Sequence, residues 1–528
     1  MAALAQAATQ TPPPARHDAP RDRLGGWSVY FAAKLFLYFR GHIPLDLPLN
    51  LLFFLLLLAT ASPSWPPPAR AARRLLAWLA AAALLWHDSW LPSPSFVGGF
   101  LTSGALPPLS YIATFLRPLL LSRETLALAA VAAAVGFSRS HIHLTWPIAA
   151  AFFFAGVHSS YHPAAAGLDG RLARFYDEQA DRRVSFTVRP RAPDLILIHV
   201  CSLAQDDLSA AGLADDPFWS GFDVLFTNFN TVTAHSGPSA LRLLRAVCGQ
   251  TPHGNLYAFD PRCSLLDALR GAGYRTYAAL DHDGAYQGFG EAIRSYAHTD
   301  APLPLAGLPV RWIGFDGTPI SDDEAVLKRW WDRRRSDGGG PAALYANIIT
   351  MHAGSHLAGS VRWWKTPPRD RYRSAFSDLT RGVDSLEKRI ASSGRSAVLV
   401  FVPEHGAALR GSSIQAADLR EMPLPYITIA PVGIKLIGFP AAASKQIVVS
   451  KPTSYLGLAS VLADILRTPP PYSSEVLSHF AESLPETPFV SENESGIVLE
   501  ADGKFYLKAR QGSWTPLPPD ALAGRSLP

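Results

Sequence analysis

Charged residues and cysteines are both scarce in this sequence of 528 residues. Asp, Glu, Lys and Arg make up only 17% of the chain, and the formal net charge of +5 is not gathered into a long basic run. Nucleic-acid binding is therefore not expected, because it depends on a clustered basic surface. Only three cysteines occur, Cys201, Cys248 and Cys263. At most one disulfide can form within the chain, which leaves one thiol for other work.

Two common sequence signatures are also missing. Gly288 and Gly290 are not followed by the third glycine of a dinucleotide-binding loop. His352 and His356 stand four residues apart, a spacing that suits a metal pair on a helix. No glutamate follows the first of these histidines, so the metalloprotease motif is absent. What the chain does have is a hydrophobic share of 48%, high for a purely soluble enzyme, and a length that predicts two or three domains.

The first part of the chain divides into a polar tail and a group of apolar runs. Residues 1–24 contain neither an apolar run nor a cleavage site, so we expect a disordered tail and no cleavable signal peptide. Residues 25–160 predict an α-helical membrane domain of about five helices, with apolar runs at 27–39, 47–61, 75–86, 126–137 and 146–157. A sixth stretch, 97–121, contains glycines and a Pro107-Pro108 pair, and we interpret it as interfacial or re-entrant.

The arginines predict how this domain is oriented. Arg70, Arg73 and Arg74 lie between the second and third runs and Arg139 follows the fourth, so both loops are expected in the cytoplasm. Five spans then place everything after residue 160 on the far side of the membrane, which in a bacterium is the periplasm. A sixth span at 97–121 would reverse this and leave the rest of the chain in the cytoplasm. The five-span interpretation predicts a multi-pass protein of the bacterial inner membrane.

The remainder of the chain predicts a linker and an α/β domain. Residues 161–193 form the expected linker, with an amphipathic helix at 168–183, and 194–528 predict an α/β fold with a central, largely parallel sheet. Short apolar runs predict strands at 195–200, 224–226, 275–279, 344–350, 397–402 and 434–438. Helices are expected at 241–247, 264–272, 322–333 and 372–392. Asp502-Gly503 predicts the turn of a β-hairpin over 497–507.

Polar residues follow two of the predicted strands of this domain, and a serine stands at the start of a helix. Cys201 comes directly after the strand predicted at 195–200, and Glu404 and His405 follow the one at 397–402. An open α/β sheet presents its ligands outside the carboxyl ends of its strands. Ser236 precedes Gly237-Pro238 at the mouth of a helix, where free N–H groups and the helix dipole favour an anion such as phosphate. Together these residues predict an active site.

A thiol, a hydroxyl, a carboxylate and an imidazole form a donor set that zinc accepts in tetrahedral geometry. A metal at this place would lower the pKa of the Ser236 hydroxyl and so activate it as a nucleophile. Each residue also has a structural interpretation: Cys201 as part of the core, Glu404-His405 as a surface loop, and Ser236 as a helix cap. Each of the three stands next to a strand end or a helix start, and their occurrence together favours the metal site.

Longer segments carry a resemblance to a known family. They include Ile198-His-Val-Cys201-Ser-Leu203 and Val402-Pro-Glu404-His405-Gly-Ala407, together with residues 86–92, 229–250, 313–317 and 488–493. In this order they closely resemble the BcsG family of cellulose-biosynthesis proteins, phosphoethanolamine transferases of the alkaline phosphatase/sulfatase superfamily. The resemblance covers most of the chain.

The resemblance implies a mechanism and a set of partners. One zinc ion is expected to be held by Cys201, Glu404 and His405, with Ser236 facing it as ligand and nucleophile. Ser236 is expected to take phosphoethanolamine from phosphatidylethanolamine as a covalent seryl intermediate. A glucosyl 6-hydroxyl of cellulose then accepts the group. The membrane helices are expected to hold the domain beside this lipid and beside subunits of the cellulose synthase complex.

Further positions carry over from the family. His352 is expected to contact the phosphate or to shuttle a proton, although Ala353 stands where the family has an aspartate. Arg420 and His356 are expected to bind substrate, with a surface position as the alternative for Arg420. His235 takes the place of a tyrosine and is expected either to donate a hydrogen bond or to act as a base.

The resemblance also bears on the cysteines. It favours a disulfide between Cys248 and Cys263, which an oxidising periplasm permits, and leaves Cys201 as the free thiolate. Two reduced, buried cysteines are the alternative.

The same residues leave three other functions open. The first is transfer to another envelope glycan such as lipid A, whose transferases have a carboxylate at the position of Cys201. The second is a scaffold role in the synthase complex. The third is a phosphatase or sulfatase that uses water as acceptor. A sulfatase is disfavoured because Ser236-Gly-Pro238-Ser-Ala240 lacks the arginine of the sulfatase maturation motif.

Overall fold

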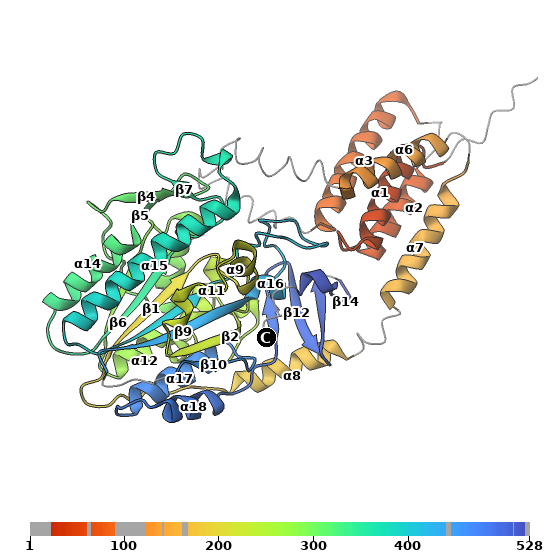
Figure 1. Ribbon diagram of the computed structural model, residues 1–528. Coiled ribbons are helices and arrows are strands. Elements are labelled where there is room, and N and C mark those ends of the chain that lie inside the picture. Colours follow the sequence, from red (N-terminus) through yellow and green to blue (C-terminus); the bar gives the residue numbers. More distant parts are fainter. Residues whose placement is uncertain are drawn as a thin grey trace, which may run out of the picture. The chain divides into compact units, whose positions relative to one another are not determined.

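The computed structural model describes residues 23–60, 65–89, 123–139, 142–160, 167–439, 445–509 and 512–522. They form two compact units, which we call the helical unit and the α/β unit (Figure 1). The helical unit contains α1 (Trp27–Phe39), α2 (Leu47–Ala59), α3 (Pro67–His87), α6 (Arg123–Ser138) and α7 (Thr145–Ser160). Nearly all of the tail predicted at 1–24, and the whole of the stretch 97–121, lie outside the described residues.

The five helices lie where the five apolar runs predict them, but their role as membrane spans is not confirmed. None of the helices in the described ranges combines the length and the apolar character needed to cross a bilayer. Large apolar side chains are nevertheless well exposed on this unit, among them Leu76, Trp78, Phe137, Trp146 and Phe153. An extended apolar exterior of this kind is characteristic of surfaces that contact lipid or another protein.

The interior of the helical unit combines aromatic packing with a buried ion pair. The rings of Phe31, Phe54 and Phe152 contact one another with centroids 5.5–5.8 Å apart. The Lys34 Nζ lies 2.8 Å from an Asp88 carboxylate oxygen, and both side chains are almost completely buried. Burial of both charges is tolerated because each has the other as a partner. The pair ties α1 to the residue that follows α3.

A seven-stranded mixed sheet forms the centre of the α/β unit. Its order is β10-β2-β9-β8-β1-β6-β3. The strands are β1 (Asp194–Val200), β2 (Val224–Asn230), β3 (Arg275–Leu280), β6 (Ala342–Ile348), β8 (Ala397–Pro403), β9 (Ile429–Ile437) and β10 (Ile447–Val449). All six predicted strands are present in this sheet, and β10 was not predicted.

Helices cover both faces of the sheet, as Figure 1 shows. One face packs against α11 (Ser236–Leu244), α12 (Leu265–Gly271), α13 (Phe289–Ala297), α17 (Tyr455–Arg467) and α18 (Ser474–Glu482). The other packs against α9 (Gln205–Ala211), α14 (Asp323–Ser336) and α15 (Pro368–Ser392). Along β1 the side chains alternate, with Leu195 and Leu197 in the first core and Ile196 and Ile198 in the second. This alternation is why the whole strand is apolar.

The central sheet is largely parallel, as predicted, and β9 is the strand in it that runs the other way. This strand pairs antiparallel with both β2 and β8, whereas the pairs β1–β6, β1–β8, β3–β6 and β10–β2 are parallel. The chain leaves β8 at Pro403, stays at that edge of the sheet through α16 (Pro425–Thr428), and enters β9 directly from it. Because β9 starts at the edge where β8 ends, it must run in the opposite direction. The sequence predicted only the second half of β9, because Pro431 and Gly433 are unfavourable in a central strand.

A second, four-stranded sheet has the order β11-β12-β13-β14. The strands are β11 (Val490–Glu492), β12 (Gly496–Ala501), β13 (Lys504–Ala509) and β14 (Trp514–Pro516). The predicted hairpin joins β12 to β13, and Asp502 and Gly503 both have positive φ, as a two-residue hairpin turn requires. The predicted linker helix α8 (Leu168–Ala180) buries Leu168 and Phe175 against this sheet.

A third, small sheet stands beside the central one, with the order β5-β4-β7. It consists of β4 (Val310–Ile313), β5 (Pro319–Ser321) and β7 (His356–Leu357).

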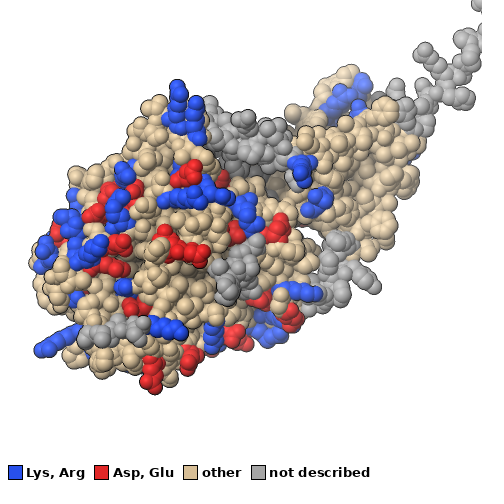
Figure 2. Space-filling view, viewed as in Figure 1, with Lys and Arg blue, Asp and Glu red and all other residues tan. Residues whose placement is uncertain are grey.

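Figure 2 shows acidic and basic side chains mixed over the face of the molecule in view. That face therefore presents no extended field of one sign.

Candidate active site

The ends of β1 and β8 bring the predicted site residues to one edge of the central sheet. The two strands are parallel neighbours in register from Asp194↔Ala397 to Val200↔Pro403, so the next residues, Cys201 and Glu404, emerge side by side. The Glu404 N–H donates to the Val200 carbonyl at 2.7 Å, which continues the ladder past the strand end. His405 follows directly. All three side chains are fully buried.

Ser236 reaches the same place from the start of α11. Its Oγ lies 3.4 Å from the Cys201 Sγ and 3.2 Å from the His405 Nε2. His235 is the N-cap residue of α11, so Ser236 occupies the first turn, where backbone N–H groups have no helical acceptor. The structure therefore brings Cys201, Ser236, Glu404 and His405 together, with the positive end of a helix dipole directed at the hydroxyl.

The donor atoms of this cluster fit a single metal ion. Ligand atoms of Cys201, Glu404 and His405 lie within 4.8 Å of one another. The Nδ1 of His405 lies 2.9 Å from the Gly406 carbonyl and donates to it, which leaves the Nε2 lone pair directed at the cluster. The Oε2 of Glu404 is buried without a hydrogen-bond partner among the described residues. A buried carboxylate oxygen of this kind is costly unless a cation binds it.

The pKa shifts of the cluster also favour a bound metal ion. Burial raises the pKa of the Cys201 thiol to about 12, and the Glu404 carboxylate adds to the rise. Burial also raises the pKa of Glu404, and burial together with Arg420 lowers that of His405. Negative charge on the thiol and the carboxylate is thus unfavourable here without a neighbouring cation. A divalent ion at this place would supply that cation and would reverse both shifts.

Arg420 links this cluster to His352. Its Nη1 donates to the Ser202 hydroxyl at 2.9 Å and lies 3.3 Å from the His405 Nδ1, and its Nη2 donates to the His352 Nε2 at 3.2 Å. The His352 Nδ1 donates to the Ala353 carbonyl. Burial, reinforced by Arg420, lowers the pKa of His352 to about 3. His352 is therefore neutral at physiological pH and acts as an acceptor that orients the guanidinium.

The other two predicted histidines take different positions. His235 makes a hydrogen bond to the Arg420 backbone, and burial lowers its pKa to about 3. His356 lies on β7, where its ring stacks on Trp363 at a centroid distance of 4.6 Å. The idea that His352 and His356 form a metal pair on a helix is wrong, because His352 lies in an irregular segment and His356 in a strand.

The sequence did not single out the residues that hold the site residues in place. The Asn347 Nδ2 donates to the Glu404 Oε1 at 2.5 Å, and the Ser239 hydroxyl donates to the Glu404 carbonyl at 2.9 Å. Asn493 accepts from the Ala234 N–H at 3.0 Å and so fixes the loop before Ser236. Asn347 lies in the strand predicted at 344–350, and a polar side chain within that apolar run was the available signal.

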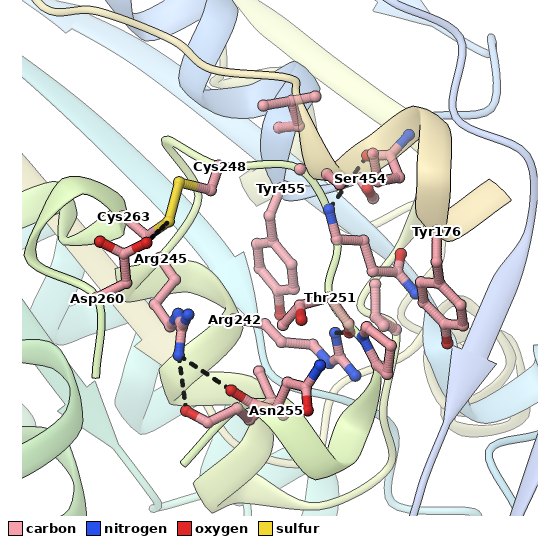
Figure 3. Close-up of a pocket in the computed structure, with 18 of the residues that line it drawn as sticks. Tyr176, Arg242, Arg245, Cys248, Thr251, Asn255, Asp260, Cys263, Ser454 and Tyr455 are labelled. Atoms are coloured by element: carbon pink, nitrogen blue, oxygen red, sulfur yellow. Dashed lines mark hydrogen bonds between the residues drawn. A yellow bond between two sulfur atoms is a disulfide. The ribbon is translucent and has the colours of Figure 1, made fainter. Parts of the chain in front are cut away.

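The far end of α11 is also held firmly. Cys248 and Cys263 form the disulfide that the family resemblance favours, and Cys201 is the free cysteine. Figure 3 shows the disulfide beside a pocket that Arg242, Arg245 and Tyr455 also line. The Arg245 Nη1 donates to the carbonyls of Leu256 and Ala258, each at 2.8 Å. These contacts fasten the helix whose first turn carries Ser236.

Comparison with known proteins identifies similar sequences along almost the whole chain. Residues 155–514 match the family model "Cellulose biosynthesis protein BcsG C-terminal domain", and 27–98 match its N-terminal counterpart. The chain is 33% identical over 557 residues to a cellulose biosynthesis protein BcsG from Escherichia coli K12, covering 94% of this chain and 96% of that protein. The BcsG protein from Salmonella typhimurium LT2 is 31% identical over 552 residues, with the same coverage.

A solved structure with a similar arrangement is a protein of the alkaline phosphatase superfamily from Vibrio parahaemolyticus. It aligns with 66% of this chain and 88% of its own, at 11% identity and a TM-score of 0.47. At that score and identity the family assignment depends on the sequence relatives.

Metal binding to this site is predicted to release protons and to strengthen as the pH rises. The pKa of about 12 for the Cys201 thiol means that the metal-free site holds a proton at neutral pH, and a cation must displace it. We expect the zinc affinity to increase about tenfold per pH unit for each proton released. Competition with a chelator between pH 6 and 8, and calorimetry in buffers of different ionisation enthalpy, measure this. An affinity independent of pH would contradict a thiolate ligand.

Asn347 is predicted to support the metal site through Glu404. Asn347→Ala removes the amide that anchors the Glu404 Oε1, and loss of such a supporting contact typically costs about 10–100-fold in metal affinity. The matched control is Asn228→Ala, because Asn228 is half-buried on β2 and its side chain donates to the Ser450 carbonyl, away from Glu404. Equal zinc affinity in the two variants would show that Asn347 has no such role.

Proposed function

Because the chain belongs to the BcsG family of cellulose biosynthesis proteins, we propose that it is a membrane-anchored, zinc-dependent phosphoethanolamine transferase that modifies cellulose. The observation that carries this proposal is the contact of the Ser236 hydroxyl with both Cys201 and His405 at the N-terminus of α11. A nucleophile, a metal-binding set and a phosphate-binding helix end coincide there. Phosphoryl transfer needs positioning and positive charge above all.

One zinc ion held by Cys201, Glu404 and His405 would supply the positive charge that activates the Ser236 hydroxyl and offsets the charge of the phosphoryl group. The chain's own residues supply the rest. The backbone N–H groups of the first turn of α11 bind phosphate oxygens. Arg420, oriented by His352, presents a guanidinium from the other side of His405.

The first step transfers phosphoethanolamine from the lipid to the enzyme. The Ser236 Oγ attacks the phosphorus of phosphatidylethanolamine, and a new P–O bond forms as the bond from phosphorus to the glycerol oxygen breaks. Diacylglycerol leaves and takes up a proton in exchange for the one that Ser236 loses. The product is a phosphoethanolamine-seryl intermediate.

The second step passes the group to cellulose. A glucosyl 6-hydroxyl attacks the phosphorus, the bond to the Ser236 Oγ breaks, and the serine recovers a proton in place of the one that the sugar loses. The two displacements use one site, so the same residues serve both.

The helical unit would keep this chemistry at the membrane. Its exposed apolar side chains, such as Trp78 and Phe153, suit a lipid environment better than water. We place the α/β unit in the periplasm of a bacterium, with the cellulose synthase complex as its neighbour. Transfer to another envelope glycan or a purely scaffolding role is disfavoured, because Cys201 replaces a carboxylate and the site is complete.

Covalent loading of Ser236 is predicted for the full chain in nanodiscs that contain phosphatidylethanolamine. Intact-protein mass spectrometry is expected to show one phosphoethanolamine-sized adduct in the presence of zinc. The adduct is expected to be absent from Ser236→Ala and after chelation, and retained in Ser209→Ala, which removes an exposed serine on α9. An adduct that persists in Ser236→Ala would exclude Ser236 as the nucleophile.

Replacement of His352 is predicted to lower the rate without changing its pH dependence. His352→Ala releases the guanidinium of Arg420, and misplacement of a positioning group costs up to about a hundredfold. His352→Gln keeps an acceptor for Arg420 and is expected to recover part of the rate. Because the pKa of His352 is about 3, the profile between pH 6 and 8 is expected to keep its shape. If the rise or fall of the rate with pH disappeared in His352→Ala, His352 would instead be identified as a proton shuttle.

A further inference from the structure

A cavity of about 380 Å³ opens beside His352, on the side of the α/β unit that carries the small sheet β5-β4-β7. Four segments enclose it: β4, the residues after β6, the start of α15 with the turn before it, and the loop at 409–418. Its lining includes His352, Ser355, Trp364, Arg371 and Asp418. The volume is in the range of sites for small molecules or for part of a polymer.

This cavity adjoins the candidate active site through a chain of side-chain contacts. His352 lines the cavity and accepts a hydrogen bond from Arg420. Arg420 lies 3.3 Å from His405, which in turn lies 3.2 Å from the Ser236 hydroxyl. A molecule in the cavity is thus separated from the nucleophile by the side chains that are proposed to bind the phosphoryl group. An acceptor in the cavity would therefore approach the phosphorus from the side of Arg420.

The cavity offers an aromatic ring that is held in place but not covered. Trp364 is 46% exposed, although large aromatic side chains are normally buried. Its neighbour Trp363 is buried, with its ring stacked on His356 and with the Arg371 guanidinium 5.4 Å from its centroid. Trp363 meets Trp364 edge to face at 6.3 Å. Trp363 therefore acts as a fixed support, and Trp364 presents its ring to a ligand.

Polar groups surround this ring. The Ser355 hydroxyl is buried and has no hydrogen-bond partner among the described residues, which is costly unless a ligand or water supplies one. Asp418 and Arg371 add a carboxylate and a guanidinium to the same lining. One open aromatic ring with hydrogen-bonding groups around it matches a sugar ring, which has C–H groups on its faces and hydroxyls along its edge.

We propose that this cavity is the acceptor subsite and binds glucosyl units of a β-1,4-glucan, with one unit stacked on Trp364 and its hydroxyls bonded to Ser355 and Asp418. This inference rests on the proposed function, because it assumes that a glucan is the acceptor. A bound chain would direct the 6-hydroxyl of a neighbouring unit past His352 and Arg420 toward the phosphorus on Ser236.

A lipid bilayer is the other partner that this region could contact. Leu357 and Val361 are exposed near Trp364, and Arg362 and Lys365 flank the tryptophans. Side chains of these two kinds together occur where proteins meet a membrane surface. The glucan is favoured because hydrocarbon cannot satisfy the Ser355 hydroxyl or the Asp418 carboxylate, whereas sugar hydroxyls can.

The test measures loading of Ser236 and its discharge to an acceptor separately. It uses the full, zinc-loaded chain in nanodiscs that contain phosphatidylethanolamine. Loading of Ser236 is measured by intact mass without acceptor, and discharge is measured after cellopentaose is added. Trp364→Ala is expected to load at the wild-type rate and to show a KM for cellopentaose about tenfold higher. Trp364→Phe is expected to recover most of this loss. The matched control, Phe259→Ala, removes a ring that is 36% exposed elsewhere on the unit, and is expected to change neither step.

Two results would overturn the subsite. One is a Trp364→Ala variant that discharges to cellopentaose like the wild type. The other is a variant that loads poorly from the bilayer but normally from a soluble short-chain lipid, which would identify a membrane contact.

Equilibrium binding of cellopentaose to Ser236→Ala, with and without Trp364→Ala, keeps this inference separate from the proposed function. Binding that depends on Trp364 supports the subsite even if no transfer is detected. Binding that is unaffected by Trp364, or no binding, contradicts it even if Ser236 is loaded.

Discussion

The parallel register of β1 and β8 is the constraint on which the rest of the site depends. It makes Cys201 and Glu404 emerge next to each other, and the bond from the Glu404 N–H to the Val200 carbonyl holds this arrangement beyond the strands. A shift of one residue would turn one side chain into the opposite core, because successive residues of a strand face opposite sides. The packing on both faces of the sheet therefore fixes the position of the ligand atoms, and a bound metal ion would neutralise the negative charge of the buried thiolate and carboxylate.

The site is built from groups that are unfavourable on their own. Cys201 and Glu404 are buried acids with raised pKa values, and His405 is held neutral next to Arg420. Ser202, beside Cys201, and Val232, in the loop before Ser236, both have positive φ, a conformation that non-glycine residues rarely adopt. Such strain persists only where surrounding contacts impose it, as Asn230 does for Val232 with a 2.9 Å hydrogen bond. A bound cation and a phosphoryl group would offset these unfavourable terms, which is why we propose them as the ligands of the site.

Much of this arrangement follows from the sequence, because strand ends and helix starts are local features. The apolar runs before Cys201 and Glu404 and the Gly-Pro after Ser236 predict where each side chain emerges. The antiparallel direction of β9 depends on where the loop after His405 returns, and no local pattern encodes that. The contacts of Asn347 with Glu404 and of Arg420 with His352 join positions 57 and 68 residues apart, so spacing could not reveal them. Trp363 and Trp364 gave no signal, because their importance comes from the cavity around them.

The central claim is that one thiolate, one carboxylate and one imidazole from two strand ends hold a single zinc ion. X-ray absorption spectroscopy of the zinc-loaded full chain tests it most directly. The account predicts one sulfur ligand at about 2.3 Å and the remaining nitrogen or oxygen ligands at about 2.0–2.2 Å. The sulfur contribution should vanish in Cys201→Ser. A zinc shell with no sulfur in the wild-type protein, or with sulfur that remains in Cys201→Ser, would contradict the claim.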